Sequence, residues 1–534
     1  MKKTLKKVLA MSLALASCCG VFAGCKEDVP DNENTLQLYI GNYGYGTEWL
    51  STLVADFKEE AWVKEKYPNL VIPKISSNSE KNYALDTIDS GTTTIDLFFS
   101  TAGAGGDLVK KSASNKVMYE NMNDLFASKI PGEGDVTVES KMQENFRLSC
   151  DYGDAETSNY MQFPWVAGYI GLLYNEALVT KYLGATYEMP RTTNELVQMA
   201  KDLNAKDGAP KAFILSSKDT DYWTCFFNTW WAQYSGLDAV LAYNEGFLGD
   251  TFGPDIFSEQ GRLETLKVIE ECLNYENKYI HTSTNTMSFT ESQGKFLKGE
   301  GVMMMNGDWM ELEMKSLSSE IPEEYEFKFL KTPIISSIVN KLQYRDGSSN
   351  KMSDEMLSAV IEAIDGGATT YDGVSPADMQ YLINARNYVS TVGGHYAYIP
   401  SYSTAKGLAK DFLLYMTTNK AIEKFMKVEQ GVSSAFQYTV DTTSDMYKGF
   451  SALQKSRLDI IEKGIYANIG TNMPLCYYGG LKPIMRNNPL ETRFTSSAAK
   501  DRKTAQQIFD EDKSFYTQKD GEQWNLLIES AGLK

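Results

Sequence analysis

A short, wholly apolar run over residues 302–305, Val-Met-Met-Met, most constrains how this chain can fold. Such a run predicts a strand buried on both faces, which is typical of a sheet covered by helices on both sides. Asn306 and Gly307 then introduce turn chemistry, so the strand ends there and presents Trp309. Ligands of open α/β sheets bind at the carboxyl ends of strands. The sequence therefore predicts a ligand site beside Trp309.

Strand and helix patterns alternate through the first hundred residues. Strands are predicted at 36–40, 70–72 and 95–99, and helices at 47–57 and 83–89. This order predicts a parallel sheet with crossover helices, and hence an α/β fold. At 534 residues the chain is too long for one ordinary core, so two lobes are expected.

The first 25 residues have the layout of an export signal. Four lysines among the first seven residues precede an apolar run at 8–16 that is too short to span a membrane. The sequence Phe22-Ala23-Gly24-Cys25 resembles a bacterial lipobox, although that pattern prefers Leu where Phe22 stands.

This resemblance implies that residues 1–24 are a signal peptide and that Cys25 carries a diacylglyceryl group after cleavage. Two acyl chains suffice for stable anchoring. Residues 25–34 would then form a lipidated tether, since they are polar and charged. An ordinary secretory signal followed by an unmodified cysteine is the alternative.

Charge and cysteine content exclude several classes of function. The formal charge of -18 argues against binding to nucleic acid or to anionic membrane surfaces, and favours a neutral or cationic ligand. With two histidines and no Cys-x-x-Cys pair, the chain offers little for a metal site, and no cofactor is expected. The disulfide status of four cysteines stays open: Cys150, Cys225, Cys272 and Cys476.

Four segments, taken in chain order, carry a family resemblance. They are Leu-Leu-Tyr-Asn at 172–175, Met-Pro-Arg-Thr at 189–192, Phe-Leu-Lys-Gly-Glu-Gly at 296–301 before the apolar strand, and Gly-Gly-His-Tyr-Ala-Tyr-Ile-Pro at 393–400 before a helical pattern at 405–416. Together with the lipobox, they resemble the extracellular solute-binding proteins of ATP-driven importers. Within that family they are similar to the carbohydrate-binding group, family 1.

The resemblance implies a periplasmic-binding-protein-like fold of type II, in which two lobes close over a ligand about a hinge of crossing segments. The first lobe is expected at 34–166 and 328–404, and the second at 167–327 and 405–534. A polar insertion at 336–392, with helices expected at 352–364 and 376–389, is expected on the rim of the first lobe.

Rings and polar groups near the predicted strand ends make up the candidate site. Trp309 matches the family's stacking tryptophan, and Asp308, Asn42 and Glu80 are candidates to hydrogen-bond sugar hydroxyls. The other candidates are Tyr43 and Tyr45 of the Gly-rich loop 41–46, Trp165, Tyr222, Trp223, His395, Tyr396, Tyr477 and Tyr478. The loop lacks the glycine spacing of a nucleotide fingerprint, and packing of its tyrosines on the lobe surface is the alternative to ligand contact.

The aromatic residues from Tyr222 to Tyr234 follow helical spacing. Trp223, Phe227, Trp230 and Tyr234 recur at intervals of four, three and four residues, which predicts one helical face packed in the core. Tyr222 and Trp223 lie at the helix start, where backbone N–H groups are free for a ligand. His395 has the same alternative of a core position.

These observations favour a lipid-anchored receptor that captures a saccharide, in particular an oligosaccharide, and delivers it to the membrane permease subunits of an ATP-driven importer. The protein is expected to be a monomer on the outer face of the cytoplasmic membrane, held there by its lipid anchor alone. No nucleophile or metalloprotease motif is present, so no catalytic residue is expected. A surface lipoprotein that hydrolyses glycans and a binder of a non-sugar solute on the same fold are the alternatives.

Overall fold

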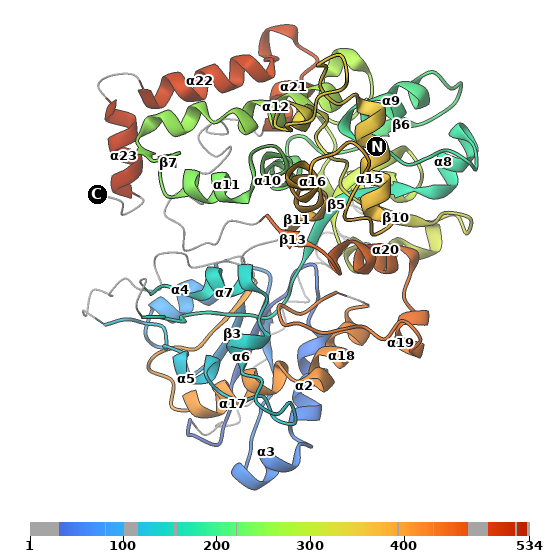
Figure 1. Cartoon of the computed structure of the whole chain (residues 1–534). Coiled ribbons are helices and arrows are strands. Elements are labelled where there is room, and N and C mark those ends of the chain that lie inside the picture. The colour runs from blue at the N-terminus through green and yellow to red at the C-terminus, as the bar shows by residue number, and fades with distance from the viewer. Residues whose placement is uncertain are drawn as a thin grey trace, which may run out of the picture.

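The computed structural model describes residues 31–80, 82–100, 116–153, 157–219, 222–391, 395–430, 432–467, 490–517 and 521–530. Over these ranges the chain forms two lobes, each built around its own sheet (Figure 1). The predicted residues Cys25, Tyr477 and Tyr478 lie outside the described residues.

The first lobe contains a five-stranded sheet in the order β2-β1-β3-β12-β4. Its strands are β1 (Leu38–Gly41), β2 (Ser76–Asn78), β3 (Leu97–Ser100), β4 (Phe163–Pro164) and β12 (Tyr396–Tyr398). β1 pairs in parallel with β2 and β3, as the strand–helix order predicts, whereas β12 is antiparallel to β3 and β4. The strand predicted at 70–72 is wrong: Val71 is exposed and makes only an isolated bridge with Thr35.

Helices cover this sheet because each has one apolar face. They are α2 (Glu48–Phe57), α3 (Ala61–Lys66), α4 (Tyr83–Asp89), α5 (Asn123–Phe126), α6 (Val138–Lys141), α7 (Glu144–Cys150), α17 (Lys406–Met416) and α18 (Asn419–Val428). The rings of Phe57 on α2 and Phe412 on α17 meet with centroids 5.1 Å apart, and those of Trp49 and Phe425 on α18 at 5.4 Å. Residues 406–428 therefore pack in the first lobe, which differs from their expected place in the second.

The second lobe is built on a sheet in the order β13-β11-β5-β9-β6, with β10 also paired to β5. Its strands are β5 (Tyr169–Asn175), β6 (Lys211–Phe213), β9 (Gly301–Gly307), β10 (Phe327–Leu330), β11 (Tyr388–Thr391) and β13 (Ile465–Tyr466). Every residue of β9 is buried, which confirms the strand predicted from the apolar run at 302–305. β9 runs antiparallel to β5 and parallel to β6.

Helices surround the second sheet as well (Figure 1). They are α8 (Glu176–Leu183), α9 (Thr193–Asn204), α10 (Tyr222–Ser235), α11 (Leu237–Asn244), α12 (Gln260–Leu273), α13 (Phe289–Leu297), α14 (Met310–Glu313), α15 (Asp354–Asp365), α16 (Pro376–Asn387), α20 (Ala452–Ile461), α21 (Leu490–Thr495), α22 (Ala505–Thr517) and α23 (Glu522–Ser530). The start of α9 follows from its sequence, because Thr192 and Glu195 form a reciprocal capping box.

Residues 328–391 belong to the second lobe, which corrects the expected division of the chain. β10 and β11 both pair with β5, so this segment extends the second sheet. The insertion lies here too and not on the first lobe's rim, because its helix α16 packs on α10, where the Tyr381 hydroxyl donates to the Tyr234 carbonyl oxygen at 2.6 Å. Arg386 holds α16 to α15 through Asp365 at 2.6 Å.

The chain passes between the lobes from β4 to β5, from β11 back to β12, and from α18 to α20. Two of these crossings lie side by side, since the Ala167 backbone N–H donates to the Ser433 carbonyl oxygen at 2.8 Å. Paired crossing segments of this kind form a hinge about which two lobes can rotate.

Candidate ligand-binding cleft

The loop after β1 and the turn after β9 meet across the lobes. The rings of Tyr45 and Trp309 pack edge to face, with centroids 5.8 Å apart at an angle of 81°. Gly44 makes this approach possible, because a Cβ atom at position 44 would lie 3.0 Å from the Trp309 ring. The carboxyl ends of a strand from each sheet thus face one another, as is usual for ligand clefts in open α/β folds.

Asp308 is the centre of a buried network between the lobes. Its Oδ1 accepts a hydrogen bond from the Tyr45 hydroxyl at 2.9 Å, and its Oδ2 accepts from Arg457 Nε at 2.5 Å. The Tyr169 backbone N–H also donates to Oδ2, at 3.1 Å, and Arg457 donates further to the Ala167 carbonyl oxygen at 3.0 Å. Burial raises the pKa of the Tyr45 hydroxyl, and the Asp308 carboxylate raises it further, so Tyr45 is a neutral donor here.

The first lobe surrounds Tyr45 with aromatic rings. Trp165 and His395 lie with ring centroids 6.0 Å and 5.2 Å from Tyr45. Trp165 is held in place by stacking on Trp49 at 4.8 Å and by donating its Nε1–H to the Ser100 carbonyl oxygen at 3.4 Å. Burial lowers the pKa of His395 to about 4, so at neutral pH this ring is uncharged.

The second lobe contributes Trp309, Tyr222 and Phe289. Tyr222, at the start of α10, lies with its ring 6.1 Å from Trp309 and 5.3 Å from Phe289 at the start of α13. Trp309 is 8% exposed and lies over Gly307, where a Cβ atom would come within 2.2 Å of the indole. The aromatic cluster is therefore continuous from one lobe to the other.

A cavity of about 670 Å³, which we call the cleft cavity, lies beside this contact. Its walls come from both lobes and from the crossing after α18. The lining residues are Asn42, Tyr43, Gly44, Tyr45, Gly46, Thr47, Glu48, Phe289, Thr290, Gln293, Leu312, Glu313, Met314, Lys315, Val428, Glu429 and Gln430. Its volume lies in the range of small-molecule sites.

The cleft cavity brings together three of the residues predicted from sequence, namely Asn42, Tyr43 and Tyr45. Trp309, Trp165, Tyr222 and His395 lie next to it in the aromatic cluster. Glu80 is exposed after the edge strand β2 and is not among the lining residues of the cavity.

Three predicted site residues have structural positions instead. Trp223 is 1% exposed and packs in the core between Phe213 and Trp230, because the whole face of α10 is buried. Tyr396 is 2% exposed, and its hydroxyl contacts Ser149 Oγ at 3.1 Å within the first lobe. Asp308 is occupied by Tyr45 and Arg457, so its carboxylate holds the lobes together and is not open to sugar hydroxyls.

Sequence reasoning missed Arg457, Glu313 and Glu429. Arg457 had a usable signal, since it stands on the apolar stripe of α20 with Leu453 and Ile460, and an arginine in such a stripe needs a buried anion. Glu313 and Glu429 had no such sequence signal, because nothing in the neighbouring residues distinguishes them from solvated glutamates.

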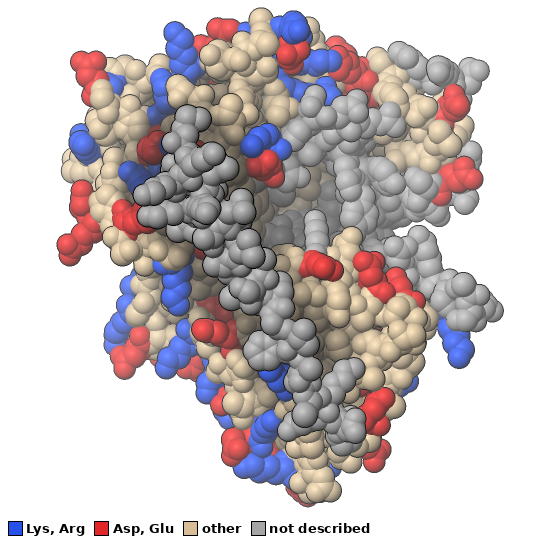
Figure 2. Space-filling view, turned by 180° about the vertical axis from the view of Figure 1, so that it is seen from behind, with Lys and Arg blue, Asp and Glu red and all other residues tan. Residues whose placement is uncertain are grey.

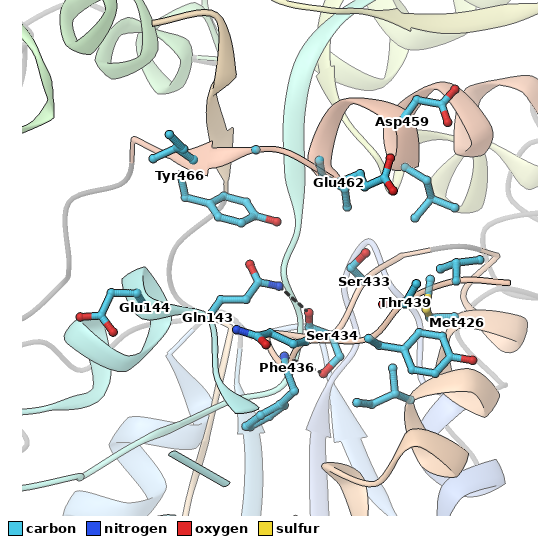
Figure 3. A pocket seen from close by; sticks show the side chains of 18 of the residues that line it. Gln143, Glu144, Met426, Ser433, Ser434, Phe436, Thr439, Asp459, Glu462 and Tyr466 are labelled. Carbon is cyan, nitrogen blue, oxygen red and sulfur yellow. Dashed lines mark hydrogen bonds between the residues drawn. The ribbon is translucent and has the colours of Figure 1, made fainter. Parts of the chain in front are cut away.

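A second cavity of about 630 Å³, the hinge cavity, lies between the lobes at the edge of the second sheet. Tyr466 of β13 faces it from one lobe, and Gln143 and Phe436 face it from the other side (Figure 3). Gln143 Nε2 donates to the Ser434 carbonyl oxygen at 3.5 Å there. In the sheet order, β11 and β5 separate β13 from β9, so the hinge cavity and Trp309 lie on opposite sides of the crossing strands.

Among the described residues, no group of three or more His, Cys, Asp or Glu side chains is placed to hold a metal ion. Cys150 and Cys272 are buried free thiols, and burial raises the pKa of both. Cys476 lies outside the described residues, and the side chain of Cys225 is not described. Among the described helices, none has the length and apolar character needed to cross a bilayer.

Comparisons with known proteins agree with this arrangement. One similar structure is T. maritima MalE3 with bound maltose, with 14% identity, coverage of 90% of this chain and 98% of that one, and a TM-score of 0.56. A second is a Thermotoga lettingae solute-binding protein with α-D-tagatose, with 15% identity, coverage of 90% and 98%, and a TM-score of 0.54. A third is the GacH receptor of Streptomyces glaucescens, solved unliganded and with acarbose, with 14% identity, coverage of 90% and 97%, and a TM-score of 0.51. These structures share the two-lobe fold. Curated protein sequences give no match. The model of the bacterial extracellular solute-binding proteins matches residues 43–423. The chain belongs to the family of bacterial extracellular solute-binding proteins.

Proposed function

We propose that the protein captures a saccharide, in particular an oligosaccharide, between its lobes and delivers it to the permease of an ATP-driven importer. The observation that carries the proposal is the contact of Tyr45 with Trp309 and Asp308 across the lobes, beside the cleft cavity. A ligand in this cavity touches both lobes, so its binding energy favours the closed arrangement. The maltose, tagatose and acarbose named for similar structures support a sugar ligand.

The cavity has the chemistry that a sugar ring requires. A pyranose has apolar faces of C–H groups and a rim of hydroxyls, and those hydroxyls must be hydrogen-bonded when they leave water. Tyr43 and Phe289 offer rings from opposite lobes, and Asn42 and Gln293 offer amides between them. Trp309 packs against Tyr45 beside the cavity and holds that ring in place.

Calorimetry on the leaderless protein tests this function directly. Titration with monosaccharides and oligosaccharides should give saturable binding to one class of sugar. If peptides, polyamines or metal ions bind while every sugar fails, saccharide capture is wrong. The ligand should also stay intact on prolonged incubation, because we propose a receptor without catalytic activity, and release of new reducing ends would instead identify a glycoside hydrolase.

We propose further that the exported protein works as a monomer attached to the outer face of the cytoplasmic membrane through a lipid on Cys25. The lipobox-like sequence before Cys25 supports this attachment. Cys25→Ser should release the protein into the medium without changing sugar affinity. Retention of this variant in the membrane fraction would contradict lipid anchoring.

A further inference from the structure

The cleft cavity is acidic, and its carboxylates come from different elements. Among its described lining residues, Glu48, Glu313 and Glu429 are acidic and Lys315 is basic. Glu48 begins α2 in the first lobe, Glu313 ends α14 in the second, and Glu429 follows α18 at the crossing. Asp and Glu side chains also lie on both lobes beside the waist between them (Figure 2). A cation in the cavity would therefore meet negative charge from both lobes.

Glu429 differs from the other two carboxylates because it is buried and incompletely hydrogen-bonded. It is 3% exposed, and its Oε2 has no hydrogen-bond partner among the described residues. As the residue after α18, it stands at a helix C-terminus, where the free carbonyl groups disfavour a negative charge. The charged groups that act on it are Glu48 of α2, which disfavours ionisation, and Lys315, which favours it.

Glu313 is a second carboxylate of the cleft cavity, on a residue that is exposed. Its Oε2 accepts a hydrogen bond from Gln293 Nε2 at 2.9 Å, while its Oε1 faces the backbone of Gly44, where a Cβ atom would lie 3.2 Å away. Partial desolvation of its carboxyl group raises the pKa of Glu313, and burial raises that of Glu429. Among the groups that act on these two carboxyls, only Lys315 is positively charged.

We propose that the ligand carries a protonated amino group and that Glu429 and Glu313 are its counterions in the cleft cavity. This inference rests on the proposed function, and it narrows the ligand from saccharides in general to amino saccharides. An organic cation suits the site better than a metal ion, because the cavity measures about 670 Å³ and includes the rings of Tyr43 and Phe289.

Calorimetry with matched sugars tests the inference. The leaderless protein is titrated with glucosamine, N-acetylglucosamine and glucose, with oligomers of each, and with the amino counterpart of any neutral sugar that binds. The amino form should bind about tenfold more tightly or better than its neutral counterparts. Its binding should also release a proton near neutral pH, measured as a dependence of the enthalpy on the buffer's ionisation enthalpy.

Glu429→Gln and Glu313→Gln keep the shape of each side chain and remove its charge. Each should abolish most of the preference for the amino form over its neutral counterpart. Glu323→Gln, at an exposed glutamate outside the cavity, is the matched control and should leave the preference for the amino form as it is in the wild type. Unchanged thermal midpoints would show that the variants fold.

The outcomes separate the inference from the function on which it rests. If neutral sugars bind and their amino forms bind no better, the counterion role is wrong and saccharide capture stands. A preference for the amino form that survives both substitutions overturns the assignment of Glu429 and Glu313. If no saccharide of either kind binds, saccharide capture fails, and the inference fails with it.

Discussion

Glu429 should make the folded protein less stable as the pH rises. Burial raises the pKa of its carboxyl to about 8, and the neighbouring Glu48 contributes to this rise. In the unfolded chain the same carboxyl titrates near about 4.3. Between these two values the folded state binds a proton that the unfolded state has lost. The stabilising effect is therefore complete below the unfolded pKa and is lost as the pH rises through the folded pKa.

The size of the effect follows from the two pKa values. They differ by between three and four units, and each unit corresponds to about 1.4 kcal/mol, so the upper bound is about 5 kcal/mol. Solvent screening does little to reduce this figure, since the side chain is 3% exposed. Glu429→Gln removes the titrating group while it keeps the shape, so its stability should fall much less over the same pH range.

Urea unfolding of the leaderless protein at a series of pH values from 5 to 8.5 measures the difference. The free energies of unfolding of wild type and Glu429→Gln should diverge by several kcal/mol towards high pH, on the order of the bound above. Glu323→Gln should follow the wild type, since it changes an exposed carboxyl. Parallel curves for wild type and Glu429→Gln would refute the reasoning, because they would mean that the carboxyl is ionised in the folded state at low pH.

Three further changes test the contacts between the lobes. Arg457→Met leaves Asp308 as a buried, uncompensated charge and should lower the free energy of unfolding by about 3–5 kcal/mol in a urea titration; a loss below about 1 kcal/mol would mean that the pair is unimportant. Trp309→Ala should weaken sugar affinity at least about tenfold by calorimetry, by removing an aromatic contact surface and the Tyr45 contact, and unchanged affinity would place the ligand elsewhere. Ile465→Trp places a larger side chain in the hinge cavity and should slow sugar release in stopped-flow experiments. Parting the lobes at Trp309 narrows this cavity, which lies on the other side of the crossing strands, so a filled cavity opposes opening. Faster release would contradict this geometry.

The turn after β9 shows what local sequence can predict. The apolar run at 302–305 and the Asn306-Gly307 turn together determine where a buried strand stops, and Trp309 is found at that place, beside the contact between the lobes. The Gly-rich loop after β1 was predictable for the same reason, since a strand pattern ends at Gly41 and two tyrosines follow.

Contacts between distant segments could not be predicted in this way. Asp308 has the pattern of a free carboxylate at a strand end, yet Arg457, 149 residues further along the chain, occupies it. The predicted division into lobes was wrong at 328–391 and at 406–428, because it depends on which sheet a strand joins and on which helices pack against each other. Trp223 was ambiguous for a related reason, since helical spacing reveals a shared face and not what lies against it.

The hydrogen bond from Tyr45 to Asp308 joins the two lobes through side chains of the protein itself. If the protein delivers its cargo as we propose, a permease that recognises the closed shape would also meet empty receptors that have closed by themselves. Each 1.4 kcal/mol that such a bond adds to closure makes these empty receptors about ten times more abundant relative to the open ones. In the proposed transport, the fidelity of import would depend on how much more free energy of closure the cargo contributes than the Tyr45 hydrogen bond does. Tyr45→Phe should then lower the background of ATP hydrolysis that empty receptors stimulate.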